Sequence, residues 1–218
     1  MIAPSLAFLF SEKERPYTGV ELRPHFLLTE LGLKGSGIAA FIGPCSVKTE
    51  HLVDWEDRLA QDRIEARKMV HFIGEFFGMG LREGVLLQRL FMAAAGDSIR
   101  EQLDVRNRAK AKKAGKSTGK KDPVLSMQLE RSGDDLFIQS GGGGGAGRKL
   151  SVSIVTASPV SVLLHAGINI DPQGAPVPAI GLKEMGIDAV EWAPEFLERF
   201  SAEWDSIQWA CAKVRPVV

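Results

Sequence analysis

The sequence predicts an α+β fold in which helices pack against a mixed, mainly antiparallel sheet. Three short apolar runs, separated by turn-forming residues, lie between residues 133 and 171 and are typical of adjacent antiparallel strands. Apolar residues at helical spacing occur on both sides of these runs, over residues 82–103 and 194–214. No internal repeat is visible, and the length suits a single domain over residues 1–218.

The first half of the chain predicts two strands, two helices and one ambiguous segment. Short apolar runs predict strands at residues 5–10 and 38–43. Apolar residues at helical spacing predict helices over residues 20–33 and 49–60. Residues 66–77 suit either a helix or a buried strand, because their Met-Val-His-Phe-Ile run is too short to decide.

The second half begins with the clearest helix of the chain, at residues 82–103. Residues 106–121 are rich in Lys and Arg and lack acidic and aromatic residues, which predicts a mobile basic loop at residues 104–122. The elements expected after this loop are a strand at 124–129, the three strands within 133–171, a short helix at 180–185 and a helix at 194–214 with Pro194 in its first turn.

Composition excludes several classes of protein. The chain has 218 residues, of which 44% are hydrophobic and 25% charged, as in an ordinary globular protein. Its formal net charge is zero, so we expect no nucleic-acid or membrane partner. The basic loop could bind nucleic acid, but a solvated loop is the favoured interpretation because it has no aromatic residues for base stacking. Two distant cysteines, no membrane span and no signal peptide predict a cytoplasmic protein.

Lys149 and Asp135 are the first candidate site residues, because each lies at the start of an expected strand. Lys149 could reach a carboxylate or a phosphate of a ligand, or could be an ordinary charged strand start. Asp135, beside Asp134, could orient a ligand or a metal ion, or could belong to a turn. The five glycines at 141–145 favour a slack loop, because no Gly-Lys-Ser/Thr follows at the spacing of a phosphate loop.

Two histidines and one cysteine are further candidates. His71 and Glu75 would share a face if residues 66–77 were helical, and could then act as an acid–base pair or half of a metal site. His165, within an apolar strand, could contact a ligand or be a hydrogen-bonded core residue. Cys45, which follows Gly-Pro at a strand end, could be a nucleophile, although a small buried residue is the more common case.

An acidic cluster surrounds Trp55 and contains Asp54, Glu56, Asp57 and Asp62. The favoured interpretation of this cluster is a solvated helix face. A cation site is the alternative.

Three short stretches resemble the sheet of the biotin/lipoate protein ligases, whose core is related to the class II aminoacyl-tRNA synthetases. These stretches are residues 134–138 (Asp-Asp-Leu-Phe-Ile), 149–153 (Lys-Leu-Ser-Val-Ser) and 165–169 (His-Ala-Gly-Ile-Asn). The sequence departs from that family at Val152, where the family has glycine, and at Asp134, where it has asparagine. The Arg-Arg-x-Ser-Gly-Gly-Gly adenylate-binding loop of lipoate ligases does not occur between residues 64 and 78.

The whole sequence also resembles an uncharacterised archaeal and bacterial family known as domain of unknown function 366. The stretches that carry this resemblance are residues 43–48, 53–57, 69–75 and 86–91, the last of which contains Gln88 and Arg89. The resemblance implies a biotin/lipoate-ligase-like fold and no established activity.

Three hypotheses on function follow from these resemblances. In the first, the protein binds or activates a small carboxylic acid or a nucleotide as a ligase or acyltransferase, with ATP and Mg²⁺ as cofactors. Lys149 and Asp135 would then be catalytic, and no resident metal site is implied. The residues expected to line or support the ligand pocket are Ser151, Ser153, His165, His71, Glu75, Gln88 and Arg89.

In the second hypothesis, the protein binds a ligand or a protein partner without catalysis, having lost the adenylation loop. In the third, Cys45 is the nucleophile of an acyltransferase.

Overall fold

The main sheet of the computed structural model has five strands in the order β1-β2-β3-β8-β7. The structure describes residues 6–113, 127–140 and 147–217. The strands are β1 (Ala7–Ser11), β2 (Gly37–Val47), β3 (Ile64–Phe77), β8 (Ser161–Asp171) and β7 (Ser151–Ala157). β1 and β2 run parallel, and all other neighbours in this sheet are antiparallel. The predicted α+β class with a mixed, mainly antiparallel sheet is confirmed.

A second, antiparallel sheet contains β4 (Met127–Ser132), β5 (Asp135–Ser140) and β6 (Arg148–Lys149) in that order. The prediction that residues 133–171 form three adjacent strands is therefore wrong in one respect, because β5 lies in this small sheet whereas β7 and β8 pair in the main sheet. The chain passes between the sheets at Leu150, whose backbone N–H donates to Leu136 and whose carbonyl accepts from Asn169. The glycines at 141–145 lie outside the described residues.

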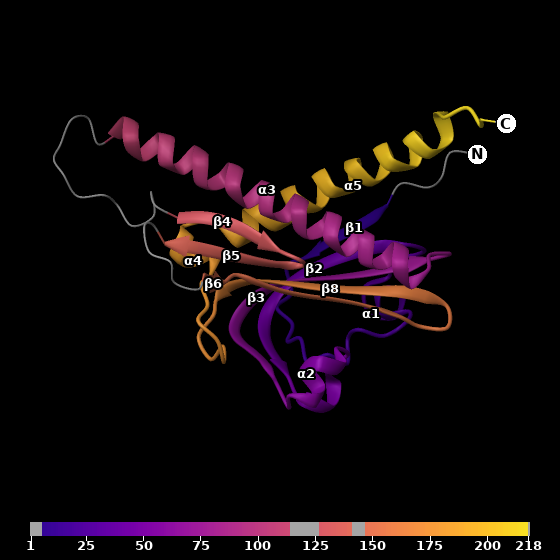
Figure 1. Cartoon of the computed structure of the whole chain (residues 1–218), viewed down its shortest axis with the longest axis horizontal. Coiled ribbons are helices and arrows are strands. Elements are labelled where there is room, and N and C mark those ends of the chain that lie inside the picture. Colours follow the sequence, from indigo (N-terminus) through magenta and orange to yellow (C-terminus); the bar gives the residue numbers. More distant parts are fainter. Residues whose placement is uncertain (1–5, 114–126, 141–146, 218) are drawn as a thin grey trace.

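Two long helices, α3 (Leu81–Lys113) and α5 (Ala189–Lys213), cover one face of the main sheet (Figure 1). In β2, β3 and β8 even-numbered side chains point toward them, as the buried side chains of Phe72, Phe76 and Ile168 show. The short helix α4 (Leu182–Met185) adds buried apolar side chains to the same core. This face is apolar and filled by side chains from the helices.

The opposite face carries the odd positions of β2, β3 and β8 and the even positions of β7, and it is covered more thinly. It is flanked by α1 (Phe26–Leu31), the 3₁₀ turn η1 (Thr49–His51) and α2 (Trp55–Leu59), which lie on the side away from α3 and α5 (Figure 1). Buried residues here include Phe41, Cys45 and Met69. Polar side chains reach the sheet on this face, so it is the face on which a site can form.

Several predicted elements change in extent. Residues 64–77 are a strand, which resolves the ambiguity of residues 66–77, because β3 lies between two neighbouring strands and is buried on both faces. The helix expected over residues 49–60 divides into η1 and α2, and the side chain of Asp54 caps α2. α5 begins five residues earlier than predicted, so Pro194 lies inside it rather than in its first turn.

The predicted mobile basic loop at residues 104–122 is partly helical, since α3 continues to Lys113. The helix extends past Leu103, the last of its residues up to position 108 that is buried, and this extension is rich in charged residues. The rest of the predicted loop, from residue 114 on, lies outside the described residues. Within the described ranges, none of the helices is both long and apolar enough to cross a bilayer.

Candidate functional site

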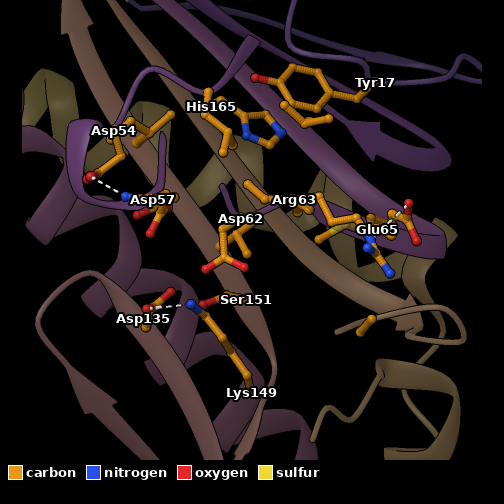
Figure 2. A pocket seen from close by; sticks show the side chains of 18 of the residues that line it. Tyr17, Asp54, Asp57, Asp62, Arg63, Glu65, Asp135, Lys149, Ser151 and His165 are labelled. Carbon is orange, nitrogen blue, oxygen red and sulfur yellow. Dashed lines mark hydrogen bonds and ion pairs between the residues drawn. The ribbon is translucent and has the colours of Figure 1, made fainter. Parts of the chain in front are cut away.

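A pocket of about 290 Å³ opens on the thinly covered face of the main sheet, next to the small sheet. Its floor contains Met69, Val152 and His165, which come from β3, β7 and β8. Its walls come from the small sheet, from residues 51–65 and from the loop after β8. In Figure 2 the ion pair of Lys149 and Asp135 lies at one end of the view, and His165 lies at the other.

The first end of the pocket holds an ion pair. The Nζ atom of Lys149 lies 2.9 Å from Oδ2 of Asp135, and both side chains are about one-quarter to one-third exposed. Burial raises the pKa of Asp135, although the hydrogen bond and charge of Lys149 act in the opposite direction and Asp134 and Asp57 add to the rise. The structure therefore brings the two predicted residues together, with their charges already paired.

Asp134 is held by two side chains from α3. Gln88 donates from Nε2 to Asp134 at 2.8 Å and to Ser153 Oγ at 2.8 Å. Arg89 forms an ion pair of 3.4 Å with the same carboxylate. Gln88 and Arg89 thus hold the Asp134 carboxylate in position, and Asp134 itself lines the pocket.

Serines 151 and 153 both line the pocket, as predicted from the lysine strand. Ser151 is fully buried and accepts a hydrogen bond of 2.8 Å from the backbone N–H of Leu136, so it joins the two sheets. Ser153 donates to the carbonyl and carboxylate of Asp134. Both hydroxyls have structural partners within the wall.

The acidic cluster of residues 54–62 forms the opposite wall of the pocket. Asp54, Asp57 and Asp62 all line it, and Figure 2 shows Asp57 and Asp62 between the two ends. Partial burial raises the pKa of Asp57, followed by the charges of Asp54 and Asp62, while Lys149 lowers it. Sequence reasoning treated this cluster as a solvated face, because nothing local to it indicates that Lys149 lies nearby.

The charged side chains that line the pocket are mostly acidic. The carboxylates are Asp54, Asp57, Asp62, Glu65, Asp134 and Asp135, and the basic groups are Arg63 and Lys149. Arg63 lies 3.3 Å from Glu65, and Lys149 is paired with Asp135. In the part of the chain that the structure describes, no Lys or Arg lies within ion-pair distance of Asp57 or Asp62. The pocket therefore has an excess of negative charge.

At the second end of the pocket, the lining residue His165 contacts the buried His71 of the neighbouring strand. Nδ1 of His71 lies 3.2 Å from Nε2 of His165, and Nε2 of His71 lies 3.3 Å from the carbonyl of Gly43. The ring of Tyr17 stacks on that of His165, with centroids 3.6 Å apart. Burial lowers the pKa of His71 to about 4 and lowers the pKa of His165 well below its ordinary value, with the charge of His71 as a second cause for His165. Both rings are neutral at pH 7.

Glu75 lies apart from this pair, so the predicted His71–Glu75 face does not exist. Four residues along a strand span about 13 Å, whereas the prediction assumed one turn of helix. The buried carboxylate of Glu75 accepts hydrogen bonds of 2.8 and 3.0 Å from the backbone N–H of His25 and one of 2.8 Å from Ser161 Oγ. Its contacts anchor the start of α1 to the sheet.

Cys45 is a buried free thiol outside the pocket lining, and its backbone pairs with that of Tyr17. Burial, with smaller effects from Glu21 and Glu65, raises the pKa of this thiol to about 12. His71, a candidate base, pairs across the sheet with Phe41, four positions along β2 from Cys45. Burial keeps the thiol protonated, and among the described residues no histidine makes a hydrogen bond to it.

The described residues contain no preformed metal site. Over residues 6–113, 127–140 and 147–217, no group of three or more His, Cys, Asp or Glu side chains is arranged so that it could hold one.

Comparisons with known proteins agree with the sequence resemblances. The family model described as Domain of unknown function (DUF366) matches residues 6–116 and 120–215. An uncharacterised protein of Methanocaldococcus jannaschii is 26% identical over 220 residues, covering 98% of this chain and 86% of that protein. A solved structure of a protein of unknown function from Pyrococcus horikoshi is 31% identical, covers 98% of this chain and 100% of that one, and has a TM-score of 0.79.

Biotin and lipoate protein ligases also occur among the similar solved structures. Biotin protein ligase from Aquifex aeolicus, for example, is 18% identical, with coverage of 93% of this chain and 71% of that one and a TM-score of 0.47.

Proposed function

This chain belongs to the family described as Domain of unknown function (DUF366), and we propose that it binds a small, positively charged organic molecule in the acidic pocket. The observation that carries the proposal is the charge of the pocket, where six carboxylates face two basic side chains. A cationic ligand supplies the missing positive charge. An anionic ligand would have to lose its hydration beside like charges, which is costly.

The pairing of Lys149 argues against the hypothesis of a small carboxylic acid or a nucleotide. A ligand carboxylate or phosphate would compete with Asp135 for this ammonium group, which is already 2.9 Å from its partner. The same ligand group would also approach Asp57, whose raised pKa reflects the neighbouring carboxylates as well as burial. Lys149 and Asp135 are better explained as a fixed pair that shapes one end of the pocket.

ATP with Mg²⁺ fits the lining residues poorly. Residues 64–77, where a lipoate ligase carries part of its adenylate-binding loop, form β3 in the middle of the sheet. The two basic side chains of the lining are both paired with carboxylates. We therefore derive no adenylation step, and the protonated thiol of Cys45 supports no acyl transfer either. Binding without catalysis is the function that these contacts favour.

The size and floor of the pocket define the ligand further. A volume of about 290 Å³ is at the lower end for small-molecule sites. Leu52, Met69 and Val152 give the lining an apolar component. We infer that the ligand combines an ammonium or similar cationic group with a short hydrocarbon body.

The test compares matched series of probes by isothermal titration calorimetry. Linear alkylamines of about four to eight carbons are titrated into the purified full-length protein, and the carboxylic acids of the same lengths serve as the second series. We expect binding of amines at one or more lengths and none of the acids. Thermal shift measurements provide a second readout, because a ligand that binds only the folded state stabilises it.

Variants identify the site of binding. Asp57→Asn with Asp62→Asn removes two lining carboxylates that have no ion pair among the described residues, and should weaken amine binding about tenfold or more, which corresponds to ~1.4 kcal/mol. Glu56→Gln is the matched control, since Glu56 lies on the same short helix but outside the lining. Binding of acids but not amines, or equal loss in the control, would refute the proposal.

A further inference from the structure

We propose that His165 presents Nδ1 to the pocket as a fixed hydrogen-bond acceptor, so that the pocket selects small amines that carry a second N–H or O–H donor at their far end. This inference rests on the proposed function, because it concerns the other end of the same pocket. It names a specificity-determining residue and the chemical class of its ligand.

A chain of hydrogen bonds fixes the proton positions. The Gly43 carbonyl can only accept, so Nε2 of His71 must carry the proton in their 3.3 Å contact. In a neutral ring Nδ1 of His71 then has no proton and accepts from Nε2–H of His165 at 3.2 Å. The remaining nitrogen of His165, Nδ1, is left with a lone pair. Burial keeps both rings neutral, so the chain persists at pH 7.

The lone pair of His165 lacks a partner in the protein. No donor among the described residues makes a hydrogen bond to Nδ1, although the side chain is only 2% exposed and lines the pocket. A ligand N–H or O–H that donates to this nitrogen would satisfy its lone pair. The stacked ring of Tyr17 covers one face of the imidazole, so a ligand can make this contact only at the ring edge.

The acidic wall and the histidine end of the pocket therefore favour different ligand groups. Asp57 and Asp62 favour a positive charge, and His165 requires a donor. In Figure 2 His165 lies away from Lys149 and Asp135, with Asp62 between them. A short chain that bears an ammonium group at one end and a hydroxyl or amino group at the other satisfies both.

The decisive experiment removes only the second donor of the ligand. Linear ω-amino alcohols of about four to eight carbons are compared with their methyl ethers by calorimetry. We expect the alcohol to bind at least about tenfold more tightly than its ether at the best length. His165→Leu should abolish this difference, while His165→Asn, which keeps an acceptor, should restore part of it.

The outcomes separate the two proposals. If no amine of any series binds, the proposed function is refuted, and this inference with it. If alcohols and ethers bind equally well, the inference is refuted and the proposed function stands.

A measurement without ligand tests the proton positions. Long-range ¹H–¹⁵N NMR spectra should show both His71 and His165 protonated at Nε2 and unprotonated at Nδ1. A proton on Nδ1 of His165 would refute the inference, whatever the ligands do.

Discussion

At the scale of single residues, burial decides the chemistry of the histidine pair. His71 and His165 face each other across β3 and β8, and almost none of either side chain reaches solvent. Because a charged imidazole is poorly solvated there, folding favours the neutral form of both rings. The pair therefore couples stability to pH.

The free energy of unfolding should fall when the pH drops below about 6.5. The unfolded chain binds a proton at His71 near its ordinary pKa of 6.5, whereas the folded chain binds it only near pH 4, so stability is complete above this range and is lost through it. We expect a loss of about 2 kcal/mol for His71 between pH 7 and pH 5, with a further loss for His165. Urea unfolding at both pH values measures it.

His71→Leu should make the stability less dependent on pH in this range. Phe41→Leu is the control, because Phe41 contacts the His71 ring but does not titrate. It should reduce stability by a similar amount at both pH values. An unchanged pH dependence in His71→Leu would contradict the assignment.

At the scale of elements, the strand β3 explains why the predicted residues of one segment have different roles. His71 and Glu75 are four residues apart in β3. An extended strand keeps their side chains too far apart to interact, whereas one turn of a helix would have brought them together. Glu75 instead reaches the first residues of α1, at His25, which has a positive φ of 63°. This carboxylate holds a strained helix start against the sheet.

Glu75→Gln should destabilise the protein by about 2 kcal/mol. The amide can offer only one acceptor oxygen to the His25 N–H and Ser161 hydroxyl, so a buried donor loses its charged partner. Glu30→Gln is the control, because its ion pair with Arg23 is exposed and should contribute less than about 1 kcal/mol. Chemical denaturation of both variants provides the measurement. Unchanged stability of Glu75→Gln with lost ligand binding would instead indicate a role in the site.

At the scale of the whole molecule, α3 and α5 form one side of the core and leave the other side free for the pocket. Trp192 of α5 is buried against Phe72 and Phe196, and its indole N–H donates to Ser98 of α3 at 3.0 Å. It therefore links both helices to the sheet. Trp209, near the end of the same helix, is 64% exposed.

Trp192→Ala should lower the free energy of unfolding by about 3–5 kcal/mol, because it leaves a large cavity between the helices and the sheet. Trp209→Ala should change it by less than about 0.5 kcal/mol. Urea unfolding followed by circular dichroism compares the two. Equal effects would show that the end of α5 is packed in solution.

Local pattern was sufficient to predict the fold class and most elements. Apolar spacing located α3 and α5, and short apolar runs located β1, β2 and β8, because burial of one face leaves a periodic trace in the residues themselves. The family was identified by resemblance, through the stretches at residues 43–48, 53–57, 69–75 and 86–91, and the family model confirms it. Lys149, Ser151 and Ser153 follow from this reasoning and do line the pocket.

Only the tertiary structure decided what the pocket contains. The order of strands places His71 beside His165 across 94 positions of sequence, and the path of residues 54–62 brings an acidic wall opposite Lys149. Neither contact leaves a local trace, because sequence periodicity records which face of an element is buried and not which element covers it. The sequence alone therefore determined an α+β member of this family, whereas long-range packing determined that its pocket is acidic and ends in a neutral histidine.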